Sequence, residues 1–291
     1  MSKSVKPLVF VDFDETISMM DTVGLLGQVG VEAHDSRIPW SYFVQSYMDD
    51  YNRVKHNLQA QQHQCVSPSL THHVTSLDGF RHVEQASLAR VSDSGILGGL
   101  SRQQWQQAGA SKVKLQTSVQ STLLDQVEPD RLYIVSLNWC KDWIRGALLL
   151  GHDGDSNYRH YDLKDDHLIC NDLSYDPKTQ LSTGVIQPTI LNTSDKFRQI
   201  QSILQLHQRD DASVPKSVYI GDSVGDLLPL VKCDVGIILG NNKKLLDILQ
   251  KIGIPVQEGL VPLSSTPAPS TDTVVYRVDD WNSIAQSGVL G

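Results

Sequence analysis

Short apolar runs that end in polar residues recur along this chain. Val9, Phe10 and Val11 lead directly into Asp12, and Asp14 lies two residues further on. A short apolar run of this kind is typical of a buried parallel strand. Side chains alternate along an extended chain, so Asp12 and Asp14 lie on one side. Ligands of open α/β sheets bind beyond the carboxyl ends of the strands, and we therefore expect both carboxylates to face a crevice.

Three later runs repeat this pattern. Residues 132–135 lead into Ser136, and residues 235–239 lead into Gly240. Residues 218–220 lead through Gly221 into Asp222. An amphipathic helix is predicted from Lys196 onward, because apolar residues then recur at helical spacing: Phe197, Ile200, Ile203, Leu204 and Leu206. The pattern favours an α/β fold with a parallel sheet.

The carboxylates come in two close pairs, Asp12 with Asp14 and Asp222 with Asp226. Two such groups repel each other unless a cation or a proton lies between them, which indicates a divalent metal or an acid/base pair. Taken alone, Asp222 and Asp226 also fit an ordinary acidic helix N-terminus. Lys196 alone would be a solvated first-turn residue.

In their order along the chain, these motifs resemble the four motifs of the haloacid dehalogenase superfamily of phosphohydrolases. They are Asp-x-Asp-x-Thr, a strand-end Ser, a Lys and Gly-Asp-x-x-x-Asp, and the resemblance covers about residues 5–17 and 130–260. It implies a Rossmann-like α/β catalytic core formed by residues 1–17 and 130–291. The intervening residues 18–129 would form an inserted helical cap that determines substrate specificity.

The resemblance also implies catalytic roles. Asp12 would be the nucleophile that forms an aspartyl-phosphate, and Asp14 the general acid and base. Lys196 would offset charge on Asp12 and on the phosphoryl group. A second acid at position 14 favours a phosphatase over a haloalkanoic-acid dehalogenase, because a halide leaves without a proton.

The implied cofactor is Mg²⁺, since carboxylate oxygens and a phosphate suit a small octahedral cation. Its expected ligands are Asp12, the main-chain carbonyl of Asp14, and Asp222, with Asp226 supporting the site or steering Lys196. The phosphate-binding residues are expected to be Ser136, Leu137, Asn138 and Thr16, of which Thr16 holds the loop.

The predicted cap lacks a strong strand signal. Its glycine-rich residues 90–100 suit either a mobile turn close to substrate or a plain interhelix loop. Its aromatic residues either stack on an organic cation or form the core of the cap; they are Trp40, Tyr42, Phe43, Tyr47, Tyr51 and Trp105. Its histidines have no ligand partners at metal spacing and are interpreted as surface residues.

Residues 168–186 predict a β-hairpin with a polar turn at 177–180. Its Asn-x-Leu and Ser-Thr-Gly sequences resemble the phosphoserine phosphatase-like branch of the superfamily. Residues 136–145 are similar to the phosphatase half of the plant bifunctional thiamine-monophosphate phosphatase and to its stand-alone fungal relatives. That similarity makes thiamine monophosphate a candidate substrate.

The composition agrees with an enzyme that acts on a small phosphorylated metabolite. The net charge of −8 argues against nucleic acid or an anionic membrane as a partner. The four cysteines contain no Cys-x-x-Cys, so neither zinc nor a disulfide framework is indicated: Cys65, Cys140, Cys170 and Cys233. The first strand begins close to Met1 and no apolar run is long enough to span a bilayer, so the expected location is the cytoplasm, with the nucleus reachable by diffusion. No oligomeric state is indicated.

The expected function is therefore a magnesium-dependent phosphatase for a small phosphomonoester. Two alternatives remain open. A phosphotransferase or mutase would use the same residues and pass the phosphoryl group to a second hydroxyl instead of water. A non-catalytic regulatory or stress-tolerance protein would keep the fold without the chemistry.

Overall fold

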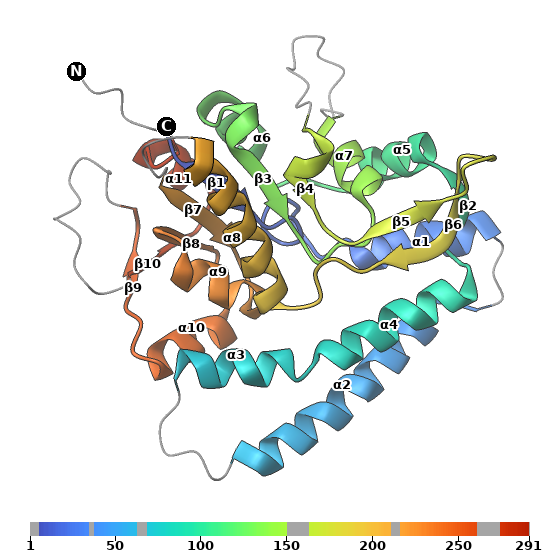
Figure 1. Cartoon of the computed structure of the whole chain (residues 1–291), viewed down its shortest axis with the longest axis horizontal. Helices are drawn as coiled ribbons and strands as arrows, with labels where there is room; N and C mark the ends of the chain where they lie inside the picture. Colours follow the sequence, from blue (N-terminus) through green and yellow to red (C-terminus); the bar gives the residue numbers. More distant parts are fainter. Residues whose placement is uncertain are drawn as a thin grey trace.

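A seven-stranded parallel sheet forms the centre of the molecule (Figure 1). The computed structural model describes residues 6–34, 38–62, 69–149, 163–210, 216–260 and 274–290. The strands lie in the order β4 (Leu168–Ile169), β3 (Leu132–Val135), β1 (Leu8–Val11), β7 (Ser217–Gly221), β8 (Val235–Leu239), β10 (Val275–Val278) and β9 (Val256–Glu258), and every pairing is parallel. The predicted α/β class with a parallel sheet is confirmed.

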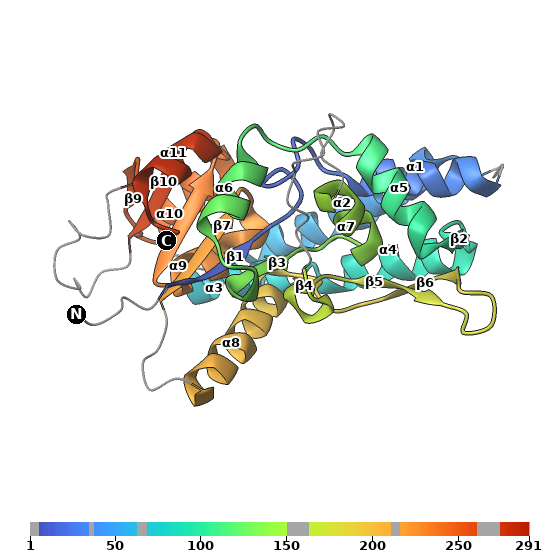
Figure 2. The ribbon, with the colours of Figure 1, turned by 90° about the horizontal axis from the view of Figure 1, so that it is seen from above.

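Helices cover both faces of this sheet, which explains why its central strands are apolar on both sides (Figure 2). Leu8 and Phe10 face one layer, and Val9 and Val11 face the other. The first layer contains α8 (Thr193–Asp210), α9 (Leu227–Lys232) and α10 (Lys243–Lys251). The second contains α6 (Val119–Gln126), α7 (Lys141–Leu149) and α11 (Trp281–Ser287). Three short 3₁₀ turns complete the core: η1 (Pro129–Arg131), η2 (Asp165–His167) and η3 (Val224–Asp226).

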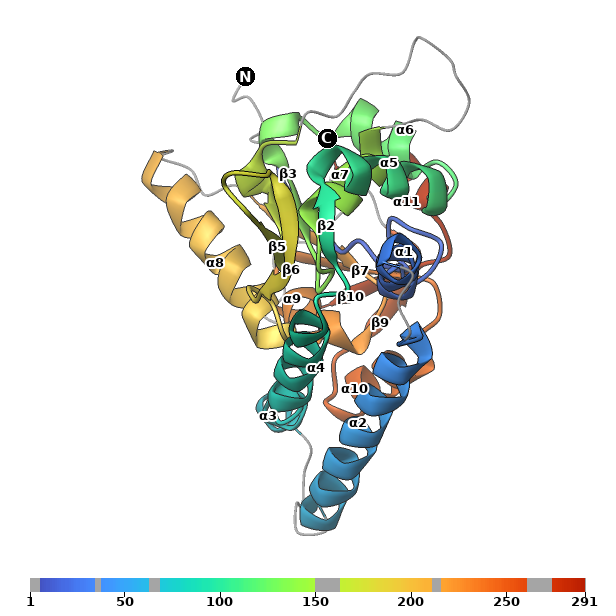
Figure 3. The same cartoon turned by 90° about the vertical axis from the view of Figure 1, so that its right-hand side faces the viewer.

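The chain between β1 and β3 is largely helical, as predicted for a cap. It comprises α1 (Val23–His34), α2 (Trp40–Gln62), α3 (Leu70–Asp78), α4 (Arg81–Ser94) and α5 (Arg102–Lys112), followed by α6. Helices α2 and α4 lie side by side and extend away from the central sheet (Figure 3). The domain boundaries at residues 17 and 129 stay a prediction.

A second, three-stranded antiparallel sheet refines two sequence predictions. It contains β2 (Gly98–Ser101), β6 (Leu181–Gln187) and β5 (Asp172–Tyr175), in that order. The predicted hairpin is confirmed, but residues 168–169 belong to the large sheet as β4, so the first hairpin strand begins at Asp172. The segment expected to be a helical cap, without a strong strand signal, also contains the short strand β2.

The glycine-rich stretch of the cap therefore contributes an ordered strand. Helix α4 continues to Ser94 and ends at Gly95, whose φ of 67° suits glycine. Strand β2 follows and pairs with β6. Gly184 of β6 has a φ of 85°, and a Cβ there would lie 3.0 Å from the Gly95 backbone. Close approach of these two segments thus explains the glycines better than a mobile turn does.

Two further features concern the chain as a whole. Among the described residues, no helix is both long and apolar enough to cross a membrane. Cys140, Cys170 and Cys233 are buried free thiols, whereas Cys65 lies outside the described residues.

Candidate active site

Two of the predicted carboxylates meet at the carboxyl ends of neighbouring strands. Asp12 follows β1 and Asp222 follows β7, and these strands pair in parallel with Val11 opposite Ile220. The main-chain N–H of Asp12 donates to the carbonyl of Ile220 at 2.9 Å. Asp12 is 6% exposed and Asp222 is 9% exposed. The parallel register therefore brings together two residues that are 210 positions apart in the chain, at the edge where open α/β sheets bind ligands.

Lys196 lies between the carboxylates. Its Nζ is 2.8 Å from Asp12 Oδ2 and 2.7 Å from Asp226 Oδ1, and the side chain is 1% exposed. Burial alone would lower the pKa of Lys196, but the two carboxylates outweigh it and hold the pKa above its usual range. Lys196 is therefore a permanently charged group in contact with Asp12.

Asp226 is fully engaged in holding the site together. Its Oδ1 accepts hydrogen bonds from Lys196 and from the hydroxyl of Tyr219, and its Oδ2 accepts from the main-chain N–H of Asp222 at 3.2 Å and of Ser223 at 3.0 Å. Burial would raise the pKa of Asp226, but Lys196 and these hydrogen bonds lower it overall. The contacts are those expected of a residue that positions Lys196.

The donor set fits a divalent cation. Asp12, Asp222 and Asp226 each offer a carboxylate oxygen, and these oxygens lie within 4.8 Å of one another. Lys196 balances only one of the three charges. Burial raises the pKa of Asp12, against the effect of Lys196, and burial with the neighbouring Asp226 raises the pKa of Asp222 to about 7. A hard cation would relieve this repulsion, and Asp12 and Asp222 accept fewer hydrogen bonds from protein groups than Asp226 does.

Asp14 is held by a separate set of contacts. Its Oδ1 accepts from the main-chain N–H of Thr22 at 2.8 Å and from the Thr22 hydroxyl at 2.6 Å. Its Oδ2 accepts from Asn138 Nδ2 at 3.0 Å. Burial raises the pKa of Asp14 to about 6, although Thr22 and Asn138 oppose the shift. A carboxyl with this pKa can both give and take a proton near neutral pH.

The loop after β3 contains the predicted phosphate-binding residues. Ser136 is buried at the end of the strand, and its Oγ accepts from the N–H of Asn138 at 3.1 Å. The carbonyl of Leu137 accepts from Asn171 Nδ2 at 2.9 Å. The Asn138 amide points to Asp14 and Thr22, so its side chain positions the general acid candidate. Phosphate contacts by this loop stay a prediction.

Thr16 contacts Asp222 and Trp281. Its hydroxyl donates to Asp222 Oδ1 at 3.1 Å, and its carbonyl accepts from Trp281 Nε1 at 2.9 Å. Both contacts tie the segment after Asp14 to the core. They fit the loop-holding role expected for Thr16, and they leave its predicted phosphate contact as a prediction.

Sequence reasoning missed three residues that hold the site. Thr22 contacts Asp14, Tyr219 contacts Asp226, and Asn171 joins the Leu137 carbonyl to the main-chain N–H groups of Thr189 and Ile190. The Asn-x-Leu sequence at 171–173 was the available signal for Asn171. Tyr219 lies inside an apolar strand and resembles any core aromatic, so its role follows only from the fold.

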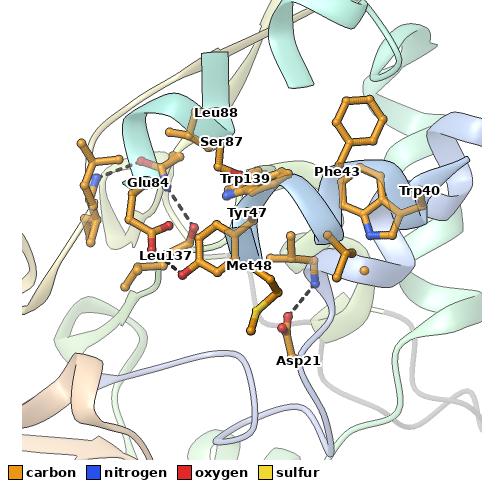
Figure 4. Close-up of a pocket in the computed structure, with 16 residues that line it drawn as sticks. Asp21, Trp40, Phe43, Tyr47, Met48, Glu84, Ser87, Leu88, Leu137 and Trp139 are labelled. Atoms are coloured by element: carbon orange, nitrogen blue, oxygen red, sulfur yellow. Dashed lines mark hydrogen bonds between the residues drawn. The ribbon is translucent and has the colours of Figure 1, made fainter. Parts of the chain in front are cut away.

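A cavity of about 370 Å³ adjoins the catalytic loops (Figure 4). Leu137 and Asp21 line it, and these residues are next to Ser136 and Thr22 in the chain. Cap aromatics form much of its wall: Trp40, Phe43 and Tyr47, joined by Trp139 from the core. Of the other cap aromatics, Trp105 is fully buried in the core, and Tyr42 is 51% exposed. The two roles predicted for the cap aromatics thus fall to different residues: Trp40, Phe43 and Tyr47 line the cavity, whereas Trp105 belongs to the core.

One acidic contact stands out in this cavity. The Tyr47 hydroxyl donates to Glu84 Oε1 at 2.7 Å, and the two side chains point toward each other in Figure 4. Burial raises the pKa of Glu84, although the Tyr47 hydrogen bond opposes it. Asp21 adds a second carboxylate, and no Lys, Arg or His is among the described lining residues.

Comparisons with known proteins support this picture. No protein-family profile matches the sequence. The chain is 30% identical over 301 residues to the CTO1 family protein C17G9.12c of Schizosaccharomyces pombe, covering 96% of this chain and 98% of the relative. It is 25% identical to the bifunctional TH2 protein, mitochondrial, of Arabidopsis thaliana, covering 95% of this chain and 48% of that protein.

A solved structure shows the same fold. A phosphoserine phosphatase, determined as a phospho-aspartyl intermediate analogue, superposes with a TM-score of 0.52 and 13% identity, covering 97% of this chain and 99% of that chain. The haloacid dehalogenase fold expected from the motifs is therefore the fold of this protein. With 30% identity to C17G9.12c over nearly the full length of both proteins, the chain belongs to the CTO1 family.

Proposed function

We propose that this protein is a magnesium-dependent phosphatase that hydrolyses a small phosphomonoester through an aspartyl-phosphate on Asp12. The observation that carries the proposal is the buried contact of Lys196 with both Asp12 and Asp226, beside Asp222 at the adjacent strand end. A cation buried against a carboxylate at a sheet edge has little structural value there, because desolvation offsets the attraction. It suits a site that must receive a phosphoryl dianion.

The proposed reaction has two steps. A carboxylate oxygen of Asp12 attacks phosphorus, the bond between phosphorus and the ester oxygen breaks, and Asp14 gives its proton to the departing alkoxide. Asp14, now ionised, takes a proton from water as that water attacks phosphorus. The phosphorus–oxygen bond to Asp12 then breaks, which releases phosphate and restores the carboxylate.

The surrounding residues prepare these steps. Lys196 offsets negative charge on Asp12 and on the phosphoryl oxygens. Thr22 and Asn138 fix the Asp14 carboxyl in one orientation. Asp12, Asp222 and the main-chain carbonyl of Asp14 would hold Mg²⁺, which supplies positive charge to the phosphoryl oxygens when bound.

The cavity beside the site suggests the type of leaving group. Its aromatic wall and its carboxylates, Asp21 and Glu84, suit a flat organic cation. Thiamine monophosphate carries such a cation, and it is also the candidate that the resemblance of residues 136–145 implies. We therefore propose thiamine monophosphate as the first substrate to test. A cytoplasmic location stays a prediction, and the A. thaliana relative is named as mitochondrial.

Phosphate release tests the proposal directly. The purified protein is expected to release phosphate from thiamine monophosphate with Mg²⁺, and EDTA should abolish the release. Asp12→Asn should reduce kcat at least about 10³-fold, because it removes the nucleophile. Asp14→Asn removes the acid that protonates the leaving group. In this variant the aspartyl-phosphate should form only from esters with good leaving groups, such as p-nitrophenyl phosphate.

The alternatives predict different products. A phosphotransferase would yield a new phosphate ester when a second alcohol is present, whereas a phosphatase yields inorganic phosphate only. Release from other metabolites but not from thiamine monophosphate would keep the mechanism and discard this substrate. A protein that releases no phosphate above the Asp12→Asn blank would have the non-catalytic role.

A further inference from the structure

A second cavity, of about 340 Å³, lies between α2, α3 and α10. Its walls come from two distant parts of the chain, the helical segment between β1 and β3 and the helix that follows β8 (Figure 1). It shares no lining residue with the cavity beside Asp14. Its volume is within the range of small-molecule sites.

The charge of this cavity is opposite to that of the whole chain. Lys55, Lys244 and Lys251 line it and Asp247 is its single described carboxylate, although the chain carries a net charge of −8. None of the three lysines forms an ion pair with another described residue. Lys244 Nζ contacts only the hydroxyl of Tyr51, at 3.5 Å. Three lysines that line one cavity and form no ion pair among the described residues create a local positive potential that attracts anions.

A buried polar atom lies in the same wall. The Nε2 atom of His73 is buried and has no hydrogen-bond partner among the residues that the structure describes. Burying such a nitrogen without a partner costs free energy. Burial, His72 and Lys251 also lower the pKa of His73 below its usual range. An anion bound beside Lys251 would oppose the effect of that lysine on the His73 pKa, so the His73 ring can report whether the cavity is occupied.

Aromatic rings complete the cavity. Tyr51 and Phe80 both line it, and their rings stack with centroids 4.6 Å apart and planes at 24°. Leu58, Leu77 and Ile248 add apolar surface. The cavity thus combines lysines with aromatic and aliphatic side chains, a combination that suits an organic group bearing an anion.

We propose that this cavity binds a small organic phosphate, with its phosphate between Lys244 and Lys251 and its ring beside Tyr51 and Phe80. The site is separate from the proposed phosphatase reaction and does not depend on it. A bound ligand would join α2 and α3 to α10.

Histidine NMR tests the proposal at the site itself. The protein is labelled with ¹³C at histidine Cε1 and carries Asp12→Asn, and Mg²⁺ is removed with EDTA, so that the catalytic site neither consumes nor strongly binds the probe. Adenosine monophosphate is the probe, with inorganic phosphate and adenosine as its two halves. The His73 signal, assigned with His73→Gln, should shift and saturate with adenosine monophosphate, and each half should bind at least about tenfold more weakly.

Paired variants separate specific from general charge effects. Lys244 and Lys251 are exposed, so Lys244→Gln with Lys251→Gln should fold normally and weaken binding at least about tenfold. Lys112→Gln with Lys178→Gln removes the same charge elsewhere and should leave binding unchanged. A shift of the His73 signal that does not saturate, or equal binding by both double variants, would overturn the proposal. Inorganic phosphate binding as tightly as adenosine monophosphate would overturn the role of the rings.

Discussion

The Thr22 hydroxyl is one of the groups that lower the pKa of Asp14 against the effect of burial. Activity that needs Asp14 as an acid should fall as pH rises through its pKa of about 6. Thr22→Val removes a hydrogen bond that stabilises the carboxylate, so the pKa should rise. The fall in kcat/KM should then move roughly one unit to higher pH, since a hydrogen bond to a charged group contributes about 1.5 kcal/mol or more.

Thr22→Ser is the matched control for this prediction. It keeps the hydroxyl, and its pH profile should stay within a few tenths of a unit of the parent profile, measured at saturating Mg²⁺. An unchanged profile in Thr22→Val would mean that Asp14 is not the group whose titration limits the reaction.

Gly221 and Tyr219 control the position of Asp226. A Cβ at Gly221 would lie 2.5 Å from Asp226 Cγ, so Gly221→Ala must displace this carboxylate and weaken its contact with Lys196. We expect kcat to fall at least about 100-fold, and the midpoint of thermal unfolding to fall as well. Tyr219→Phe removes one of several hydrogen bonds and should cost about tenfold at most. Equal kcat values in Gly221→Ala and the parent would show that Lys196 does not need Asp226.

The predicted site residues belong to sequence motifs, whereas the missed residues are placed only by the folded path of the chain. Asp12, Lys196, Asp222 and Asp226 occur in a recognisable order along the chain, two of them directly after apolar strands, and the structure brings them together. Thr22 follows no strand and belongs to no motif, because its contact with Asp14 depends on the path of the chain into α1. A hydrogen bond formed by loop geometry leaves no periodic signal in the sequence.

Among the elements, β2 could not be predicted from the sequence either. Its sequence contains two glycines and no β-branched residue, so strand propensity is low. Pairing with β6 makes it a strand. Strands β1, β3, β7 and β8 were predictable because burial on both faces requires continuous apolar runs, and β6 because its exposed and buried residues alternate.

Helices α3 and α4 are fastened to the first turn of α8, which carries Lys196. Arg81 pairs with Asp195 at 2.7 Å, and Ser194 donates to Asp78 at 2.7 Å. Arg81→Gln should lower the free energy of unfolding by less than about 1 kcal/mol, because Arg81 is 41% exposed. Arg81→Gln should also lower kcat a few-fold, because the first turn of α8, which carries Lys196, loses its ion pair with Arg81.

Urea unfolding and steady-state kinetics would measure both effects. Arg53→Gln, which removes an exposed contact with Asp50 on α2, is the control and should change neither quantity. If Arg81→Gln lowers the stability but leaves kcat unchanged, the contact between Arg81 and Asp195 has a structural role only.

For the whole molecule, Mg²⁺ should be a ligand of the folded state. At 100 times its Kd, it should stabilise the protein by about 2.7 kcal/mol, seen as a higher midpoint of thermal unfolding. Asp222→Asn should lose most of this gain. The same gain in both proteins would place the metal elsewhere.

The sign of the pH effect follows from the raised pKa of Asp222. Its value of about 7 exceeds the ordinary 3.8, so the folded protein holds a proton that the unfolded chain releases. Without Mg²⁺, this contribution to stability is present below pH about 4 and is lost as pH rises through 7. Asp222→Asn should remove the loss, so its stability relative to the parent should increase over that range. Unfolding at pH 4 to 7.5 in EDTA would measure it.

The small antiparallel sheet limits how this architecture can be divided. β2 lies between β1 and β3 in the chain, whereas its partner β6 follows β4, so the sheet is completed by two separate crossings from the core. Removing residues 18–129 as one cassette would leave β6 with an open edge, and open edges pair with other chains. Replacing the segment between β1 and β3 of this chain would therefore require a replacement of the β5–β6 hairpin at the same time.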